Sequence, residues 1–447
     1  MDTLPDRRPI LERYAGQNLP RYTSYPTAPH FSALEEATYR AWLAAVEPRD
    51  RLSLYLHIPF CKSLCWYCGC HTAVTRSVAR TSRYAEGLVA EAGLLAAALP
   101  AAPVESLHLG GGTPSAIGAE ALDRVLTALR DRFEFLDEAE LSVELDPRML
   151  DPATVAVLAR QGFSRASLGV QDMAPHVQKL IGRIQPPELV EAAVAKLRGA
   201  GIARINFDLM YGLPGQSCDD VAASARFAAA MGADRVAVFG YAHVPWMKPH
   251  QNAIRQEDLP GSFARMEQAD AAERALLAAG YIAIGLDHFA RPGDSMAVAA
   301  EAGVLKRNFQ GYTTDRAPVL IGLGASAIGA LPQGYAQNIP DERGWLAAVE
   351  KGHLPVTRGL RLTEEDRVRR DIIEAVMCDL ALDLRRVPGA IWRAAEPRLA
   401  PLVADGLAAV ENGRLVATES GRRFVRHIAA CFDAYLGGGP ARHSSAV

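Results

Sequence analysis

Short apolar runs alternate with longer, alanine-rich amphipathic runs between residues 51 and 280. The short runs are typical of buried β-strands, and the longer ones of α-helices. We predict strands over 52–58, 106–109, 140–145, 166–170, 204–210 and 235–241, with a seventh candidate over 281–286. Helices are predicted between them over 83–99, 118–133, 152–161, 187–200, 219–231 and 261–279.

This regular alternation indicates parallel strands that are joined by crossover helices. Six or seven such units favour a full or partial (β/α) barrel over a short open sheet. The fold class that we predict is therefore α/β, with a partial (β/α)6-type barrel as its main body.

The two ends of the chain have different patterns. The first 50 residues are polar and contain several prolines, which predicts an arm with one short helix over 37–46. The end of the chain predicts helices over 364–378, 388–395, 399–405 and 420–435, with a hairpin over 406–418 that turns at Asn412-Gly413. We therefore divide the chain into an N-terminal arm (1–50), a barrel domain with its extension (51–360) and a mainly helical C-terminal domain (361–447).

Three helices and a hairpin resemble a winged helix. Such a domain could bind DNA or could simply cover the barrel, and we favour the cover because a fold does not imply a function. The glycine-rich end, residues 437–447, is predicted to be a floppy tail.

Composition and charge exclude several classes of protein. Of the 447 residues, 49% are hydrophobic and 22% are charged, so most of the chain is expected to fold. The net charge is −3, which leaves no overall basic surface for nucleic acid or an anionic membrane. The beginning of the chain lacks the apolar core of a secretory signal, and no apolar run is long enough to span a bilayer. We therefore expect a cytoplasmic protein.

Four of the seven cysteines fall within ten residues, at Cys61, Cys65, Cys68 and Cys70. An odd number of cysteines in a large chain without a secretory signal argues against a disulfide framework. The cluster instead predicts a metal or redox site. The remaining cysteines, Cys218, Cys378 and Cys431, are expected to be ordinary buried thiols.

In a (β/α) barrel the working residues lie at the carboxyl ends of the strands. Each of the first six predicted strands ends in residues that can carry chemistry. In strand order they are the cysteine loop after HIPF, the GGGTP run at 110–114, Glu144 with Asp146, Gln171 with Asp172, Asp208 with Tyr211, and Tyr241 with His243. An arbitrary scatter of polar residues would not produce this arrangement six times, so we predict one functional site at this edge.

The cysteine loop suits an iron–sulfur cluster. Cys61, Cys65 and Cys68 are spaced four and three residues apart, which lets one loop reach three corners of a cubane cluster. The fourth iron would stay open to a ligand with an amine and a carboxylate. The alternatives are a zinc site that uses Cys70 or His71, and cysteines buried together by coincidence. Zinc sites usually show two separated ligand pairs, which this sequence lacks.

The glycines and polar residues at the strand ends each have two interpretations. Gly110 to Gly112 would let backbone amides approach a ligand, or would only form a tight turn. Gln171 could bind a ribose or an adenine, and Arg183 could pair with a carboxylate. Taken singly, each of these residues is more often structural.

The carboxylates at the strand ends are equally ambiguous. Glu144, Asp146 and Asp208 could hold an amine or ribose hydroxyls. They could also cap helices or form salt bridges, and Asp146, which precedes Pro147, most resembles a turn residue.

Taken together, the motifs resemble those of a known family. CxxxCxxC after a first barrel strand, with GGGTP after the second, is similar to the radical S-adenosylmethionine (SAM) superfamily. The segments PRYTSYPTA, LYLHIPFCKSLCWYCGC, VELDPR, SLGVQD, INFDLMYGLP, GYAHVP, GLDHFARP, RNFQGYTT, GASAIG and YAQN narrow the resemblance to the oxygen-independent coproporphyrinogen III oxidases. The resemblance extends from the arm to near Leu436.

The resemblance implies roles for individual residues. Cys61, Cys65 and Cys68 would ligate a [4Fe–4S] cluster, whereas Cys70 is typical of the family without being a ligand. One SAM molecule on the open iron would contact Tyr55, Gly111, Glu144, Ala242 and Ile328. A second SAM molecule would contact Tyr67, Gly112, Thr113, Gln171, Arg183 and Asp208. Tyr55, Glu144 and Arg183 would be the catalytic residues.

The implied reaction is the oxidative decarboxylation of two propionates of coproporphyrinogen III to vinyl groups, which yields protoporphyrinogen IX. An unactivated C–H bond is beyond acid–base side chains, so a cofactor must carry that step. A flavodoxin- or ferredoxin-type electron donor and a monomeric protein are also implied. We predict Arg21, Arg291 and Arg307 as anchors of the substrate carboxylates, because they lie in the arm and in late loops that could close over the barrel.

Two other functions compete with this interpretation. A haem chaperone of the same superfamily would share the cluster and GGGTP motifs, but the PRYTSYPT arm and Cys70 favour the oxidase. A zinc-binding regulator that uses the C-terminal region on DNA is disfavoured by the near-neutral charge and by the coherent set of strand-end residues.

Overall fold

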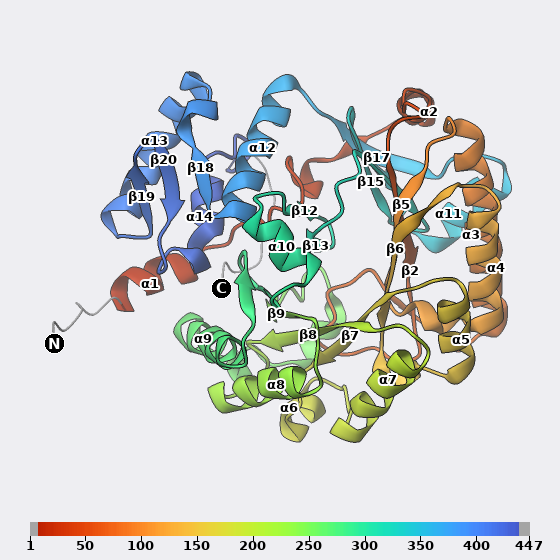
Figure 1. Cartoon of the computed structure of the whole chain (residues 1–447), viewed down its shortest axis with the longest axis horizontal. Coiled ribbons are helices and arrows are strands. Elements are labelled where there is room, and N and C mark those ends of the chain that lie inside the picture. Colours follow the sequence, from red (N-terminus) through yellow and green to blue (C-terminus); the bar gives the residue numbers. More distant parts are fainter. Residues whose placement is uncertain (1–7, 438–447) are drawn as a thin grey trace.

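The computed structural model describes residues 8–437, and one large sheet forms the centre of the fold (Figure 1). Thirteen strands make up this sheet. From one edge to the other they are β1 (Ser32–Ala33), β17 (Val356–Arg361), β16 (Gly334–Asn338), β15 (Ile328–Leu331), β14 (Val319–Leu323), β2 (Leu52–Ile58), β5 (Val104–Gly111), β6 (Phe135–Leu145), β7 (Arg165–Gln171), β8 (Arg204–Tyr211), β9 (Arg235–Gly240), β11 (His288–Ala290) and β10 (Ile282–Ile284).

The part of the sheet from β14 to β9 is parallel. Its last six strands, β2 and β5 to β9, follow one another in chain order, which confirms the six predicted strands. Among the described strands, β1 and β10 end the order without pairing with each other, so the barrel is partial. The α/β fold class is thus confirmed.

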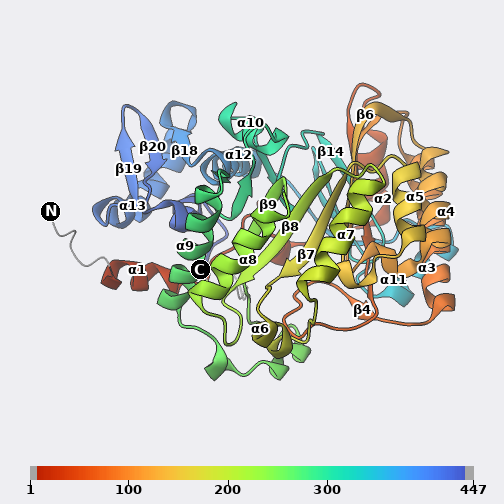
Figure 2. The same ribbon diagram turned by 60° about the horizontal axis from the view of Figure 1, so that its bottom comes forward.

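Helices cover the outer face of the parallel strands (Figures 1 and 2). They are α3 (Val78–Ala98), α4 (Ala119–Arg130), α5 (Pro152–Arg160), α7 (Pro187–Gly199), α8 (Cys218–Ala230) and α9 (Ser262–Ala278), and each overlaps a predicted helix. Their buried faces follow the helical period: α4 buries Leu122, Val125 and Leu129 against the sheet. Polar caps begin several of them, as in α8, where Ser217 and Asp220 form a capping box.

The segment predicted as a seventh barrel strand has a different role. Its strand, β10, pairs antiparallel with β11, and β11 pairs antiparallel with β9. The seventh parallel strand is instead β14, which lies beside β2 and was not predicted. From β14 the sheet continues as an antiparallel meander through β15, β16 and β17.

Short elements complete the barrel and its extension. At the carboxyl ends of the strands lie β3 (Phe60–Cys61), β4 (Ala73–Val74), η2 (Pro114–Ile117), η3 (Pro147–Met149), α6 (Pro175–Leu180), η4 (Pro249–Ala253) and η5 (Gln256–Asp258). The extension contains α10 (Ser295–Glu301), β12 (Lys306–Asn308), β13 (Gly311–Thr313) and α11 (Glu342–Glu350).

The C-terminal region packs as a separate cluster of elements beside the barrel (Figure 1). These are α12 (Glu364–Asp379), β18 (Ala381–Asp383), η6 (Leu384–Arg386), α13 (Gly389–Ala404), β19 (Ala408–Glu411), β20 (Arg414–Ala417), η7 (Arg422–Phe424) and α14 (Val425–Ala430). The predicted hairpin is confirmed, with Asn412 and Gly413 both at positive φ, and β18 adds a third strand.

Three predicted helices of this region are wrong in extent. The predicted helices 388–395 and 399–405 are one helix, α13, which continues through Pro397 and Pro401. Burial of Leu399 and Leu402 in the C-terminal core stabilises this helix and offsets the loss of the hydrogen bonds that the two prolines remove. The predicted helix 420–435 is reduced to η7 and α14, and the tail from residue 438 onward lies outside the described residues.

The first 50 residues pack into both parts of the molecule. They form α1 (Arg8–Ala15), η1 (Ala28–His30), β1 and α2 (Glu36–Ala44). Tyr14, Tyr22 and Tyr25 belong to the C-terminal core, whereas Trp42 and Leu43 belong to the barrel core. The three-part division of the chain stays a prediction. Among the described helices, none is both long and apolar enough to cross a membrane.

Candidate active site

The residues predicted from the strand ends lie at one edge of the sheet, because all six strands run in the same direction. Two short elements mark this edge, α6 after β7 and β4 after the cysteine loop, and both lie on the same side of the barrel (Figure 2). The cysteine loop itself begins at β3 and contacts α6, where the Trp66 amide donates to the Ile181 carbonyl at 3.0 Å.

Cys65 is the most buried of the clustered cysteines, and two guanidinium groups face its sulfur. Arg148 Nη2 and Arg183 Nη1 each donate to Cys65 Sγ over 3.5 Å. Two cationic donors favour a thiolate, which is the form that ligates iron. This environment therefore fits a metal-bound cysteine better than an ordinary buried thiol.

The other two predicted ligands are half-buried and lie within electrostatic reach of one another. Burial raises the pKa of Cys61 to about 12, and the neighbouring sulfurs of Cys68 and Cys65 add to the rise. The hydrogen bond from the Cys70 thiol lowers the pKa of Cys68 to about 6. Burial and the neighbouring sulfurs thus oppose the ionisation of Cys61, and a metal ion would reverse that opposition.

Within residues 8–437, no three His, Cys, Asp or Glu side chains converge on one point as the ligands of a single metal ion do. A cubane cluster binds each thiolate at a different iron, so its ligands are spread over three corners.

Arg183 connects the cysteine loop to two strands. Its Nη1 forms an ion pair with Asp146 at 3.2 Å, and its Nη2 donates to the Gly169 carbonyl of β7. Asp146 also forms an ion pair with Arg148 at 2.6 Å and accepts from the Arg148 amide at 3.0 Å. The turn role that we expected for Asp146 is confirmed, and the carboxylate additionally holds both arginines beside Cys65.

Glu144, at the end of β6, is held as a carboxylate. Its Oε1 is 3.1 Å from His108 Nε2, and its Oε2 accepts from the Gly111 amide at 3.2 Å. Burial alone would raise the pKa of Glu144, but the His108 hydrogen bond and charge outweigh it, so the net pKa is below the ordinary value. A half-buried anion at a strand end is suited to a ligand amine.

Tyr55 lies on β2 between two imidazoles. Its hydroxyl is 3.0 Å from His57 Nδ1, and its ring stacks on His108 with 12° between the planes. His57 Nε2 is 2.9 Å from the His71 carbonyl, and burial lowers the pKa of His57 to about 4. The imidazole of His57 is therefore neutral at pH 7 and orients Tyr55 without adding a charge.

Asp208 is a second buried carboxyl group near Glu144. It accepts from the Ser167 hydroxyl at 3.1 Å. Burial, assisted by the Glu144 charge, raises the pKa of Asp208 to about 7. The two carboxyl groups lie on β6 and β8, on either side of β7, and their pKa values shift in opposite directions, because only Glu144 forms a hydrogen bond with a histidine.

Gln171 ends β7 in a left-handed conformation, with φ of 66°. A non-glycine residue at this φ is strained and is often found at a functional site. Its amide nitrogen lies beside Gly169, where a Cβ would be 2.8 Å from Gln171 Nε2 and 3.2 Å from Arg183 Nη2. The structure thus brings Gln171 and Arg183 together.

The glycine run is packed against the beginning of the cysteine loop. The Gly112 amide donates to Ile58 at 2.9 Å, and the Thr113 amide donates to Phe60 at 2.8 Å. The Thr113 side chain is buried and is 3.1 Å from the Asp146 amide and from the Ser115 hydroxyl. These amides and this hydroxyl are therefore engaged within the protein, and so is the Thr113 carbonyl, which accepts from the Ala116 amide at 2.9 Å.

The remaining predicted contacts lie around the same edge. Ile328 is half-buried on β15 and packs against Gly322 of β14. Gly322 lies opposite Tyr55 in the parallel pairing of β14 with β2. Tyr67 and Ala242 are linked by one side chain, because Gln251 Nε2 donates to both of their carbonyls, at 2.9 and 3.2 Å.

Sequence reasoning did not find the segment that supports the cysteine loop. From the region of η4, Lys248 donates to the Cys70 carbonyl at 2.7 Å, and His250 Nε2 is 2.8 Å from the Cys68 carbonyl. Gln251 is fully buried and supports Tyr67. In the sequence this segment is only a polar run after GYAHVP. Nothing in that run indicates a contact with the cysteine loop, which lies about 180 residues earlier in the chain.

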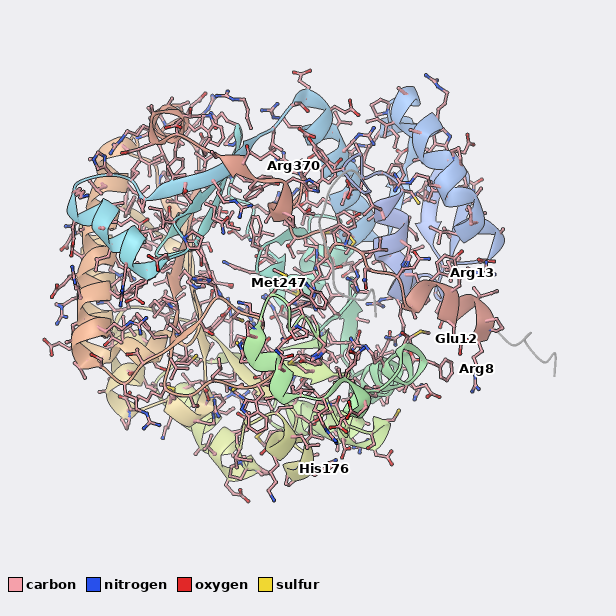
Figure 3. All side chains as sticks on the ribbon, turned by 180° about the vertical axis from the view of Figure 1, so that it is seen from behind. Arg8, Glu12, Arg13, His176, Met247 and Arg370 are labelled. Atoms are coloured by element: carbon pink, nitrogen blue, oxygen red, sulfur yellow. The ribbon has the colours of Figure 1, made fainter. Side chains whose placement is uncertain are left out.

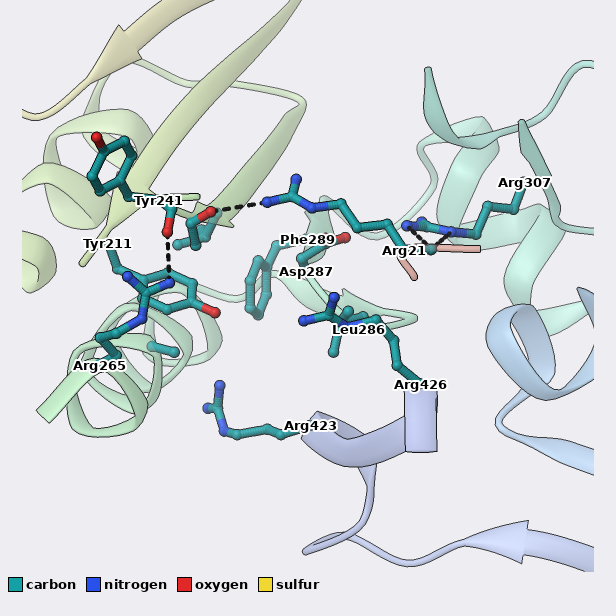
Figure 4. Close-up of a pocket in the computed structure, with 13 residues that line it drawn as sticks. Arg21, Tyr211, Tyr241, Arg265, Leu286, Asp287, Phe289, Arg307, Arg423 and Arg426 are labelled. Atoms are coloured by element: carbon teal, nitrogen blue, oxygen red, sulfur yellow. Dashed lines mark hydrogen bonds between the residues drawn. The ribbon is translucent and has the colours of Figure 1, made fainter. Parts of the chain in front are cut away.

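Two of the three predicted anchors lie together in a pocket rich in arginine (Figure 4). Arg21 donates to the Gly240 carbonyl at 3.0 Å, and Arg307 donates to the Arg21 carbonyl at 3.2 Å. The same pocket is lined by Arg265 of α9, Arg423 of η7 and Arg426 of α14, which sequence reasoning missed. It lies at the carboxyl ends of β8 and β9, next to Tyr211 and Tyr241.

The prediction for Arg291 is wrong. Its amide donates to the Asp234 carbonyl at 2.9 Å, which places it at the amino end of β9. The reason is the direction of β11, which runs antiparallel to β9 and carries the chain away from the site before Arg291.

Three clustered cysteines, two guanidinium donors on one of them and a glycine run at the next strand end define a radical SAM site on a partial barrel. The Radical SAM superfamily model matches residues 55–228 of the chain, and the HemN C-terminal domain model matches residues 362–424. Membership of this superfamily implies a [4Fe–4S] cluster and SAM as cofactors, and the donor set described above fits the cluster.

Named relatives narrow the class further. The chain is 47% identical to an oxygen-independent coproporphyrinogen III oxidase of Bradyrhizobium diazoefficiens, over 99% of this chain and 100% of the relative. It is 46% identical to the oxidase of Paracoccus denitrificans, over 93% of this chain and 94% of the relative. The solved coproporphyrinogen III oxidase of Escherichia coli, described as a radical SAM enzyme, superposes with a TM-score of 0.88 at 37% identity, covering 94% of this chain and 100% of that one. The chain belongs to the oxygen-independent coproporphyrinogen III oxidases, as the sequence motifs predicted.

Proposed function

We propose that this chain converts coproporphyrinogen III to protoporphyrinogen IX by oxidative decarboxylation of the propionates on rings A and B. The observation that carries the proposal is the pair of guanidinium donors on Cys65, inside a loop that lies at the same strand edge as Glu144 and the arginine-rich pocket. A bound [4Fe–4S] cluster supplies the electron that splits SAM into methionine and a 5′-deoxyadenosyl radical able to abstract a hydrogen atom from a propionate.

Cys61, Cys65 and Cys68 would hold the cluster in this proposal. Arg148 and Arg183 each donate to the Cys65 sulfur, and Asp146 holds both guanidinium groups in place. Cys70 would stay outside the ligand set, since its carbonyl is held by Lys248 and its thiol donates to Cys68.

The residues around Glu144 would bind the SAM molecule at the open iron. The Glu144 carboxylate offers a charge partner for the amino group of SAM, and the Gly111 amide fixes its orientation. Tyr55, Ala242 and Ile328 would line the same molecule from β2, the end of β9 and β15.

A second SAM molecule would lie against Tyr67, Gly112, Thr113, Gln171, Arg183 and Asp208. Asp208, with its pKa near 7, can donate or accept a hydrogen bond to ribose hydroxyls. Gln171 offers an amide group from its strained backbone position. Arg183 and Thr113 are engaged by the protein, so we assign them to shaping this subsite, together with the Gly112 carbonyl.

The substrate carries four propionates, which need cations in a site that excludes water. We assign this role to the pocket shown in Figure 4, in which Arg21 and Arg307 come from the arm and from β12. Arg307 stacks on the Tyr312 ring at 4.3 Å, and its Nη1 is buried with no hydrogen-bond partner among the described residues. That N–H is directed to a ligand in this proposal.

The experiment that tests the proposal is an anaerobic turnover of the reconstituted chain with SAM, a strong reductant and coproporphyrinogen III. The proposed chemistry predicts two molecules each of CO2 and 5′-deoxyadenosine for every protoporphyrinogen. A chain that released the nucleoside but left all four propionates intact would contradict it.

A further inference from the structure

The three main segments that form the surface around the cysteine loop lack acidic residues. Three segments meet there: 59–79, 173–187 and 241–256, and none of them contains Asp or Glu. The exposed Lys62, Arg76 and Lys179 give this surface a positive charge. No carboxylate in the described part of the chain forms an ion pair with any of these three. The carboxylates near α6 are engaged elsewhere: Asp220 is 3.4 Å from His176 (labelled in Figure 3), and Asp172, which is fully buried, accepts from the Ala174 amide at 2.6 Å.

Large apolar side chains are exposed within the same surface. Trp66, Leu180 and Ile184 are 40%, 41% and 57% exposed. They are neighbours, because the Trp66 ring lies 3.2 Å from a Cβ built on Gly182, between the other two. A contiguous apolar patch that is rimmed by charges of one sign is typical of a protein-binding surface. We refer to Lys62, Trp66, Lys179, Leu180 and Ile184 as the loop face.

The loop face adjoins a proposed cluster ligand, Cys65, in two ways. Trp66 follows Cys65 directly in the chain. Ile184 follows Arg183, whose guanidinium group is 3.5 Å from Cys65 Sγ.

We propose that the loop face is the docking surface of a small, acidic electron-transfer protein that reduces the cluster. This inference rests on the proposed function. One electron leaves the partner, which is oxidised by one electron, and enters the cluster; no bond forms and no proton moves. Redox partners bind through small interfaces and are steered by complementary charge, which matches a compact apolar centre ringed by lysines.

The test uses the reconstituted full chain and a reduced flavodoxin of net negative charge. Lys179→Glu and Ile184→Ser each change the loop face without touching Cys65 or its arginines. Lys196→Glu makes the same charge reversal on exposed α7, near the helix end that leads away from the site. The measurements are the dissociation constant of oxidised flavodoxin at low and high salt, and the rate of cluster reduction by flavodoxin and by dithionite.

We expect Lys179→Glu to weaken flavodoxin binding about tenfold at low salt, to slow flavodoxin-driven reduction by a similar factor and to flatten the salt dependence. Ile184→Ser should weaken binding at both salt concentrations. Dithionite-driven reduction should be unchanged in both variants, and Lys196→Glu should behave as wild type. Equal binding by Lys179→Glu and wild type, or an equal loss in Lys196→Glu, would overturn the docking proposal. A dithionite-reduced chain that fails to cleave SAM would overturn the proposed function instead.

Discussion

Gly112 lies where the chain leaves β5 and passes beneath the beginning of the cysteine loop. A Cβ at this position would be 2.5 Å from the Phe60 carbonyl oxygen, and the contact is with backbone, which cannot move aside easily. Gly199, at the end of α7, has nothing within 4 Å of the same built atom. The two glycines therefore differ in what they tolerate, although the sequence alone presents both simply as glycines.

We expect Gly112→Ala to lower stability by about 1–3 kcal/mol through this overlap and to reduce cluster content after reconstitution. Gly199→Ala should change stability by less than about 1 kcal/mol. Thermal unfolding and iron and sulfide analysis of both variants measure the effects. Equal stability and equal iron content in the two variants would show that the beginning of the loop does not depend on Gly112.

At the residue scale, the sequence predicted which residues gather at the site but not what each one contacts. Spacing predicted the cysteine loop, and position at a strand end predicted Glu144 and Asp208. The different protonation of these two carboxyl groups follows from His108, which reaches Glu144 from the neighbouring strand. Arg148 and Arg183 were similarly beyond prediction as donors to Cys65, because side-chain contacts across strands leave no local pattern.

At the element scale, the segment around η4 holds the cysteine loop through backbone carbonyls. Gln251 is the buried member, and its side-chain Oε1 accepts from the Val244 amide at 2.6 Å. Replacing it with alanine leaves the carbonyls of Tyr67 and Ala242 without their donor, at a cost of about 1–3 kcal/mol for each buried group.

Gln251→Ala should therefore lose iron several times faster than wild type when a chelator is added. Asn252→Ala is the matched control, because Asn252 is exposed and donates only to Pro249, at 2.8 Å. Loss of the visible absorbance of the cluster follows the process. If Gln251→Ala and Asn252→Ala lost iron at the same rate, Gln251 would not support the cysteine loop.

A second element-scale device joins α3 to the meander. Buried Glu91 accepts from the Gly324 amide at 2.7 Å, from Asn338 Nδ2 at 2.6 Å and from Trp345 Nε1 at 3.0 Å. Burial outweighs these donors and raises the pKa of Glu91 from 4.5 to about 7.

A carboxyl group with a raised pKa in the folded state contributes stability that is fully present below its unfolded pKa. That stability is lost as the pH rises through the folded value, here between about pH 4.5 and pH 7. The contribution is up to about 3 kcal/mol. We expect Glu91→Gln to reduce the decline of the melting temperature over this window. A decline as steep as in wild type would contradict the assignment.

The helices and parallel strands were predictable because apolar period and strand–helix alternation are local signals. The β14 to β17 meander was not predicted, since its strands are short and β14 pairs with β2, more than two hundred residues earlier in the chain. Direction is equally nonlocal: the antiparallel course of β11 is what removes Arg291 from the site.

At the scale of the whole molecule, the arm and the C-terminal region bring their arginines to the mouth of the barrel. Arg21 comes from the arm, Arg423 and Arg426 from the C-terminal region and Arg265 from the barrel (Figure 4). This arrangement supports the interpretation of the C-terminal region as a cover, and under the proposed function the cover would take part in substrate binding.

Binding of oxidised coproporphyrin III to the cluster-free chain tests the role of the pocket arginines in substrate binding without requiring turnover. Arg21→Ala and Arg307→Ala should each weaken binding about tenfold, since a carboxylate loses a charged partner. Arg291→Ala should bind as wild type, because Arg291 lies at the amino end of β9. Porphyrin fluorescence measures all three. Equal weakening by Arg291→Ala would attribute the effect to net charge and contradict a specific pocket.

The central claim is that the loop of Cys61, Cys65 and Cys68 carries radical SAM chemistry on coproporphyrinogen III. The most direct measurement compares wild type with Cys65→Ala in the anaerobic turnover assay, with tetrapyrroles and 5′-deoxyadenosine separated by chromatography. We expect wild type to form protoporphyrinogen together with the nucleoside, and Cys65→Ala to form neither. Protoporphyrinogen made by Cys65→Ala, or nucleoside made by wild type without any decarboxylated product, would contradict the account.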